Sequence, residues 1–235
     1  MALGPARKRE LLAKLRLFSG LEPRELDALA AVARTRTPAA REEHFHKGDA
    51  GREVYAVVQG TLKVLTTSEE GDDVVFNLLG PDDVIGEIAM LCDAERSASV
   101  IALSPCELLV LERRDLLAFL RGHPEASLQL MAVLAERVRN LSQLVEDTRF
   151  LNLPVRLAKK LVAYAASHGE RTPEGIRIAL KLSQEEWGDL VGATRESVNK
   201  QMRAWADQGL IRLDQGYVVI RRAQALEALA GAPFV

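Results

Sequence analysis

The sequence has few cysteines, no long apolar run and no secretory leader, and each absence excludes a class of protein. Cys92 and Cys106 are the two cysteines among 235 residues. They are too few for the roughly four thiolates of an iron–sulfur cluster, and each is expected to be a buried thiol. No segment approaches the roughly 18 apolar residues of a membrane span. The N-terminal MALGPARKRE lacks the apolar region of a secretory signal. We therefore expect a protein of the reducing cytoplasm with no membrane partner.

The composition that remains is that of an ordinary globular protein with unevenly distributed charge. Hydrophobic residues make up 48% and charged residues 27% of the chain, and its length allows two modest domains with separate cores. The formal net charge is −2, but it is unevenly distributed. The part from Asn152 onward has 12 Lys/Arg and 9 Asp/Glu, whereas the rest of the chain has 19 Lys/Arg and 24 Asp/Glu. A mildly basic C-terminal part suits an anionic partner, although this signal is weak by itself.

The apolar pattern changes twice and predicts an α+β protein in three parts, residues 1–122, 123–151 and 152–235. Up to about residue 35, apolar residues at helical spacing predict short helices. Between about residues 36 and 112, short apolar segments alternate with turn residues, which predicts a small antiparallel β-barrel or jelly roll. The expected strands are 54–58, 62–65, 74–79, 99–102 and 108–111.

A single long helix is predicted from about Glu125 to Arg149, where the chain has no Gly or Pro. Its apolar seam steps by three and four residues, the pattern of a two-stranded coiled coil. A helix packed on its own barrel would also carry an apolar stripe, but the narrow seam favours a homodimer. Asn152-Leu153-Pro154 then ends the helix and marks a domain boundary. The predicted dimer residues are Met131, Leu134, Val138, Leu141, Val145 and Thr148.

The segment LSQEEWGDLVGATRESVNKQMRAWADQGLI predicts two helices joined by a tight turn. Ser183 and Glu186 form a capping box for a helix that ends near residue 191. Gly192 allows the turn, and Thr194 caps a second helix that ends near residue 207. Residues 211–213 and 217–220, on either side of Asp214-Gln215-Gly216, predict a hairpin or wing.

The second of these helices has two different faces. Its apolar residues Val198, Met202 and Trp205 fall on one side, which we expect to be buried. Hydrogen-bond donors and acceptors occupy another arc, as on a helix that reads the major groove. An ordinary helical hairpin with a solvated polar face is the alternative. The polar arc consists of Arg195, Glu196, Asn199, Lys200 and Arg203.

A second motif lies in the predicted barrel, where Gly86-Glu87-Ile88-Ala89 is followed by Glu95-Arg96-Ser97-Ala98. It resembles the phosphate-binding cassette of cyclic-nucleotide-binding domains. Together with the downstream GATRESVNK, the whole chain resembles the cyclic-AMP receptor/fumarate-nitrate regulator family. The resemblance implies a cyclic-nucleotide-binding β-jelly-roll, a dimerisation helix and a winged helix-turn-helix, in a regulator of transcription rather than an enzyme.

The cassette has a physical logic, because a buried cyclic phosphodiester needs a paired cation and several donors. Arg96 can supply two forked donors, while Ser97 and the backbone N–H groups around residues 86–89 and 98 supply others. Glu87 can accept from the ribose 2′-hydroxyl. The alternative is a Glu87–Arg96 salt bridge in an empty barrel, as in ligand-independent relatives. By resemblance, the barrel side of the pocket consists of Val64, Phe76 and Leu79.

The chain departs from the family where the central helix meets the base. Cyclic-AMP receptors have Thr-Ser or Thr-Asn there, and this chain has Leu141 and Ser142, so one base contact is lost. The expected effector is cyclic AMP or another cyclic purine nucleotide. Gating by cyclic GMP or a cyclic dinucleotide, and a ligand-independent regulator, stay open. No haem, metal or iron–sulfur cluster is expected.

The resemblance also implies the partners: a second copy, near-palindromic duplex DNA with half-sites about 34 Å apart, and RNA polymerase. Arg195 and Glu196 would read base edges, and Lys200 a base or a phosphate. Backbone phosphates would be held by Ser183, Gln184 and Thr194. The sequence has no Ser-His-Asp, metal or P-loop signature, so no catalytic residue is assigned. His44 and His46 are expected at loops or strand edges, without a role, as is His123 near a helix start.

Overall fold

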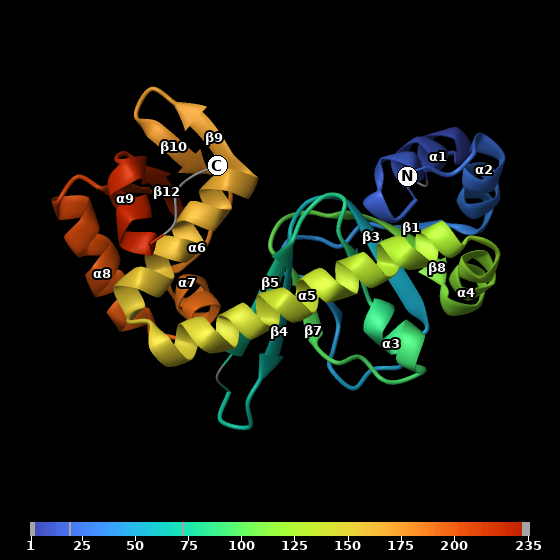
Figure 1. Cartoon of the computed structure of the whole chain (residues 1–235), viewed down its shortest axis with the longest axis horizontal. Coiled ribbons are helices and arrows are strands. Elements are labelled where there is room, and N and C mark those ends of the chain that lie inside the picture. The colour runs from blue at the N-terminus through green and yellow to red at the C-terminus, as the bar shows by residue number, and fades with distance from the viewer. Residues whose placement is uncertain (1–2, 19, 72, 232–235) are drawn as a thin grey trace. The chain divides into compact units, whose positions relative to one another are not determined.

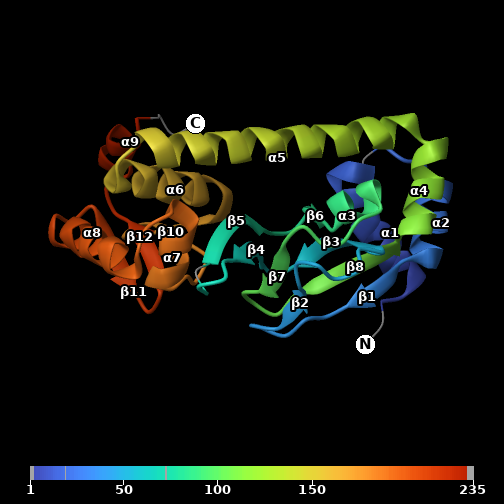
Figure 2. The ribbon, with the colours of Figure 1, turned by 90° about the horizontal axis from the view of Figure 1, so that it is seen from below.

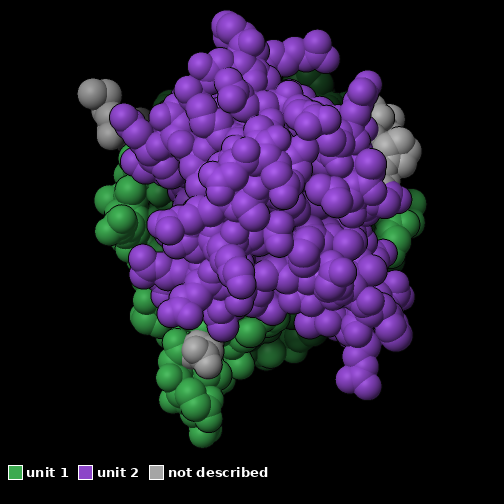
Figure 3. Space-filling model, turned by 90° about the vertical axis from the view of Figure 1, so that its left-hand side faces the viewer, with its two compact units in different colours: residues 1–139 green, residues 140–235 purple. Residues whose placement is uncertain are grey.

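The computed structural model describes residues 3–18, 20–71 and 73–231. The chain forms two compact units, residues 1–139 and 140–235, coloured separately in Figure 3 and labelled by element in Figure 1. The division falls within helix α5 (Pro124–Phe150). This helix confirms the long helix predicted over residues 125–149. It ends before Asn152, which caps helix α6 (Leu153–His168) by accepting a hydrogen bond from Val155 N–H.

The first unit contains two four-stranded antiparallel sheets, with strand orders β1-β8-β3-β6 and β2-β7-β4-β5. Neighbouring strands are mostly distant in sequence, which is the topology of a jelly roll. All five predicted strands are confirmed, and β1, β2 and β6 add to them. The strands are β1 (Arg34–Arg36), β2 (Glu43–Phe45), β3 (Glu53–Gln59), β4 (Leu62–Thr67), β5 (Asp73–Leu79), β6 (Val84–Ile85), β7 (Ser99–Ala102) and β8 (Glu107–Glu112).

Helices cover one end of this barrel. In Figures 1 and 2, α1, α2 and α4 gather beside β1 and β8. Pro5 and Pro23 each occupy the first turn of a helix, where a missing N–H costs no hydrogen bond. The helices of the unit before α5 are α1 (Pro5–Lys14), the short 3₁₀ helix η1 (Arg16–Phe18), α2 (Pro23–Val32), α3 (Glu87–Cys92) and α4 (Arg113–Gly122).

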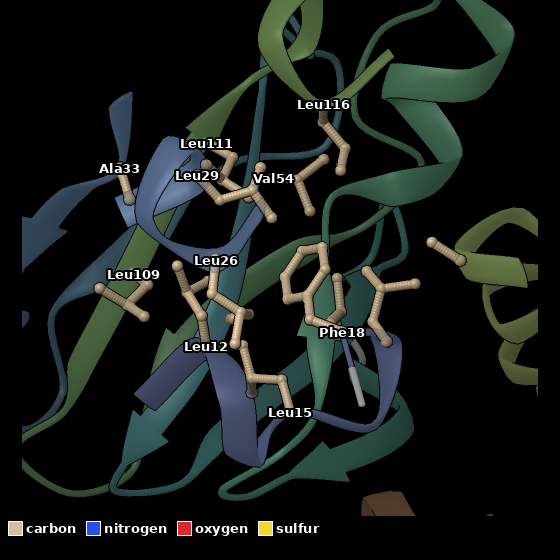
Figure 4. Packing of buried hydrophobic residues seen from close by; sticks show 14 of the residues in the cluster. Leu12, Leu15, Phe18, Leu26, Leu29, Ala33, Val54, Leu109, Leu111 and Leu116 are labelled. Carbon is tan, nitrogen blue, oxygen red and sulfur yellow. The ribbon is translucent and has the colours of Figure 1, made fainter. Parts of the chain in front are cut away.

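The sheet that contains β3 buries both of its faces. Val54 and Ala56 point to an outer core formed with α1, α2, α4 and the start of α5, part of which Figure 4 shows. Tyr55 and Val57 alternate with them and enter an inner core between the two sheets. This alternation follows from the two-residue period of a strand. The inner core, bounded by side chains of both sheets, is the interior of the barrel.

His123 joins three helices of the first unit. Its ring Nδ1 lies 2.8 Å from the carbonyl oxygen of Phe119 on α4, and its Nε2 lies 2.7 Å from a carboxylate oxygen of Glu25 on α2. Pro124, which begins α5, follows directly. Both partners accept hydrogen bonds, so the ring satisfies both when each nitrogen carries a proton.

The second unit is a winged helix domain. The predicted hairpin is confirmed as β11 (Ile211–Asp214) and β12 (Tyr217–Ile220), and it belongs to a sheet of order β11-β12-β10-β9. Within the described residues, no helix is both long and apolar enough to cross a membrane. The other elements of this unit are β9 (Gly169–Thr172), β10 (Gly175–Ile178), α7 (Gln184–Val191), α8 (Arg195–Asp207) and α9 (Ala223–Ala230).

Candidate anion-binding cassette and nucleic-acid interface

The cassette begins at Gly86, which connects β6 to α3 in a left-handed conformation with φ of 89°. A Cβ atom at this position would lie 2.4 Å from Nη1 of Arg96 and 2.8 Å from the carbonyl oxygen of Glu53. Both distances are shorter than any normal contact, and the positive φ also favours glycine. Gly86 is therefore required for the backbone to pass this close to Arg96.

Arg96 is buried, with 4% of its surface exposed. Its backbone N–H donates to the carbonyl of Asp49, and its own carbonyl accepts from Gly48 N–H, so the main chain is fixed. Nη1 donates to the carbonyl of Gly86 over 3.2 Å, while Nε is buried without a hydrogen-bond partner. In the described part of the chain, the structure records no ion pair for Arg96. A buried cation without an anion is costly, so this position suits an anionic ligand.

Glu87 lies on the other side of Gly86 and is 1% exposed. One carboxylate oxygen, Oε1, accepts from Nη1 of Arg137 on α5, and Nη2 of Arg137 donates to the carbonyl of Val84. The other oxygen, Oε2, is buried and unpartnered. The alternative Glu87–Arg96 salt bridge is therefore wrong, because the cation paired with Glu87 is Arg137. Glu87 retains one acceptor for a ligand hydroxyl.

The other predicted ligand residues differ in exposure. Ala89 and Ala98 are buried, whereas Ile88 and Ser97 are exposed. Leu141 and Ser142, both exposed, belong to the second unit.

The three predicted barrel residues also differ. Leu79 and Val64 pack in the inner core. Phe76 is half-buried and lies outside that cluster, because the pairing of β4 with β5 shifts there. The register passes from Val64 opposite Asn77 to Leu65 opposite Val75, which leaves Phe76 as the extra residue. Asn77 rather than Phe76 faces Val64.

The predicted dimer seam is mostly uncovered in the single chain. Met131, Val138, Leu141 and Val145 are exposed by 44–70%, and Thr148 is also exposed. Leu134 differs, because it is half-buried against the chain's own outer core. The start of α5 thus packs on its own barrel, and the rest of the seam offers an apolar stripe to another surface.

His44 was expected at a loop or strand edge, and it lies on β2, an edge strand of its sheet, but its side chain is buried there. It is the central residue of β2 and only 5% exposed, and neither ring nitrogen has a hydrogen-bond partner. Burial, together with the charges of Arg36 and Arg96, lowers the pKa of His44 to about 4. The ring is therefore neutral beside Arg96. His46 is exposed, with Nδ1 2.6 Å from a carboxylate oxygen of Glu43.

The two cysteines differ from each other. Cys106 is buried as expected, and burial raises the pKa of its thiol. Cys92 is exposed, which corrects the expectation of a buried thiol. The described residues contain no group of three or more His, Cys, Asp or Glu side chains placed to hold a metal ion.

The caps of the helix-turn-helix are as predicted. The Ser183 hydroxyl accepts from Glu186 N–H, and the Glu186 carboxylate accepts from Ser183 N–H. The Thr194 hydroxyl accepts from the backbone N–H of Ser197 over 3.3 Å. Gly192 has φ of 63° and turns the chain between α7 and α8. These four residues fix where both helices begin and where the first ends.

Arg156 on α6 holds this turn, a role that no local sequence pattern predicts. Its Nε donates to the carbonyl of Val191, Nη2 to that of Gly192 and Nη1 to that of Leu151. Carbonyls at a helix end have no partner within the helix. Arg156 therefore satisfies two carbonyls at the end of α7 and ties them to the residue that follows α5.

Helix α8 presents the expected two faces. Val198, Met202 and Trp205 are at most 3% exposed. Asn199 is half-buried, and the half-buried Gln184 on α7 has a buried, unpartnered Oε1. The remaining predicted DNA contacts are exposed, namely Ser183, Thr194, Arg195, Glu196, Lys200 and Arg203.

Two family models match the chain. One, the cyclic nucleotide-binding domain, matches residues 35–123, and the other, the Crp-like helix-turn-helix domain, matches residues 155–229. The cyclic AMP receptor protein of Thermus thermophilus is 34% identical over 214 residues, which cover 91% of this chain and 96% of that protein. A CRP-like cAMP-activated global transcriptional regulator of Mycobacterium tuberculosis is 31% identical over 220 residues, which cover 92% and 97%.

Solved structures share the fold. A CRP-family transcriptional regulator of Thermus thermophilus superposes with a TM-score of 0.73 at 24% identity, covering 85% of this chain and 98% of that one. The c-di-GMP-responsive global regulator of Xanthomonas campestris superposes with a TM-score of 0.75 at 19% identity, covering 85% and 99%. At such identities the likeness concerns the fold alone.

Proposed function

We propose that this chain, which belongs to the family of CRP-like transcription regulators, is a cytoplasmic homodimer whose binding to specific DNA is controlled by a cyclic purine nucleotide. It joins a cyclic nucleotide-binding domain to a Crp-like helix-turn-helix domain. Cyclic AMP is the first candidate. The relative from Thermus thermophilus is named a cyclic AMP receptor protein, and that from Mycobacterium tuberculosis a cAMP-activated regulator.

The observation that carries the effector proposal is a pair of buried, unpartnered polar atoms on either side of Gly86. Nε of Arg96 is a free donor, and Oε2 of Glu87 is a free acceptor. Buried polar groups are normally hydrogen-bonded, so both atoms suit a ligand with an anionic group and a hydroxyl. A cyclic 3′,5′-phosphodiester with a free 2′-hydroxyl has both. Ser97, which is exposed, would add a donor to the phosphate.

We expect the site to distinguish adenine from guanine less well than a Thr-Ser pair would. Leu141 cannot form a hydrogen bond, while the hydroxyl of Ser142 can donate or accept and so fits adenine or guanine. Cyclic GMP is therefore the second candidate.

Arg137 supports a route from the nucleotide to the DNA-reading domain. It belongs to α5 and donates hydrogen bonds both to Glu87 and to the carbonyl of Val84, two residues before Gly86. A hydroxyl bound at Glu87 would act on the same carboxylate that holds α5. The exposed apolar stripe of α5 supports the dimer, in which two copies of α8 would face half-sites about one DNA turn apart. RNA polymerase is the proposed further partner.

The test is isothermal titration of the full chain with cyclic AMP, cyclic GMP and cyclic di-GMP, followed by DNA binding with and without the ligand found. Arg96→Leu should remove nucleotide binding, because an unpaired buried phosphate costs about 3–5 kcal/mol, at least a hundredfold in affinity. Arg114→Leu is the matched control, since that side chain is 82% exposed. Equal DNA affinity with and without every nucleotide would instead indicate a ligand-independent regulator.

A further inference from the structure

The guanidinium of Arg96 lies on two aromatic rings. Its Cζ is 4.3 Å from the ring centroid of Phe45 and 5.4 Å from that of Tyr55. The two rings are stacked, with centroids 5.8 Å apart and planes inclined by 28°. Phe45 belongs to β2 and Tyr55 to β3, which are strands of different sheets. Both sheets of the barrel thus contribute a ring to the surface below this cation, and we call the pair the aromatic shelf.

The aromatic shelf has its own supports. The Tyr55 hydroxyl donates to a carboxylate oxygen of Glu53 over 2.7 Å, and Glu53 is paired with Arg34. The ring of His44 meets Tyr55 edge-on, with centroids 4.2 Å apart. Because this imidazole is neutral, it adds no positive charge that would repel Arg96. The rings are therefore held in place independently of any ligand.

The attraction between a cation and the face of an aromatic ring is strongest where water is excluded. Arg96 satisfies this condition, being 4% exposed. Among the described residues it has no carboxylate partner, and its guanidinium contacts the two rings and the carbonyl of Gly86. Leucine at either position could fill a similar volume but would not attract the cation.

We propose that Phe45 and Tyr55 are positioning residues for the phosphate of the nucleotide, because they hold the Arg96 guanidinium in its binding orientation before the nucleotide arrives. The inference rests on the proposed function and deepens it. A cation that is already ordered loses little conformational freedom when it binds, and this raises affinity without a contact between the rings and the ligand.

The test compares Phe45→Leu and Tyr55→Leu with Tyr55→Phe in the full-length dimer. Isothermal titration with cyclic AMP should show a roughly 5- to 30-fold loss of affinity for Phe45→Leu, the range of a desolvated cation–π contact. Tyr55→Leu, whose ring is farther from the cation, should lose less. The control Tyr55→Phe keeps the ring and loses the hydrogen bond to Glu53, and its affinity should stay within about twofold of wild type.

A second readout needs no ligand and separates positioning from packing. The Nε–H resonance of Arg96, assigned with Arg96→Lys, should show a ring-current shift in the ligand-free wild type, and Phe45→Leu should reduce this shift to the contribution of the more distant Tyr55 ring. Retained affinity in Phe45→Leu, or an unshifted Arg96 resonance in the wild type, would overturn the proposal while the proposed function stands. If the wild type bound neither cyclic AMP nor cyclic GMP, the proposed function itself would fail, and the phosphate role with it.

Discussion

Replacing Arg137 tests whether the cassette and α5 are joined by one ion pair. Glu87 is 1% exposed, and in Arg137→Met its buried carboxylate would lose the cation that is paired with it. The carbonyl of Val84 would lose a donor as well. Breaking a buried pair by removing one partner costs about 3–5 kcal/mol. Because the Arg137 side chain is 23% exposed, water can reach part of the gap, and we expect the lower end, about 3 kcal/mol.

The measurement is urea unfolding at fixed protomer concentration, within a double-mutant cycle that includes Glu87→Gln. The double mutant should be less destabilised than the sum of the single mutants, with a coupling of about 2 kcal/mol between two groups in direct contact. Arg139→Met, an exposed position on the same helix, is the control and should stay within about 0.5 kcal/mol of wild type. Additive effects at Arg137 and Glu87 would refute the ion pair as the link between cassette and helix.

Three further outcomes are expected. Arg195→Ala should lose roughly 1–3 kcal/mol of binding free energy on the cognate duplex and relax the preference at one base pair, whereas Arg203→Ala should weaken binding to all sequences alike. Titrations with cognate and random DNA measure both effects, and equal losses on the two DNAs for Arg195→Ala would contradict base reading. Leu141→Thr should raise the preference for cyclic AMP over cyclic GMP by up to about tenfold, or one hydrogen bond; an unchanged ratio in isothermal titration would assign base selection to the barrel. Hydrogen bonds to a backbone carbonyl and to Glu25 raise the pKa of His123. The stabilising contribution of His123 should therefore be complete below about pH 6.5 and be lost as the pH rises through the raised pKa. The difference in unfolding free energy between wild type and His123→Gln should narrow from pH 5.5 to 8.5. A constant difference would show that the ring does not titrate in the folded protein.

The elements that could be predicted from the sequence are those with a complete local signal. The capping box at Ser183, the turn at Gly192 and the alternation along β3 each lie within a few neighbouring residues, and all are present. Strands β1, β2 and β6 have only two or three residues, too few to show a period of two. They form because neighbouring strands supply their hydrogen bonds, and a local sequence pattern does not predict this pairing.

The same distinction explains which parts of the cassette could be found. Gly86, Glu87 and Arg96 lie within eleven residues, and their spacing carried the resemblance. Arg137 and Phe45 are each about 50 residues from the groups they touch, and neither residue type stands out on its own element. Phe45 resembles an ordinary core residue because it is partly buried and packs against the inner core. Its proposed positioning role depends on Arg96, which lies in the loop after α3. A fold that buries Glu87 and Arg96 must surround them with groups that offset the lost hydration, and Arg137 and Phe45 are two of these groups.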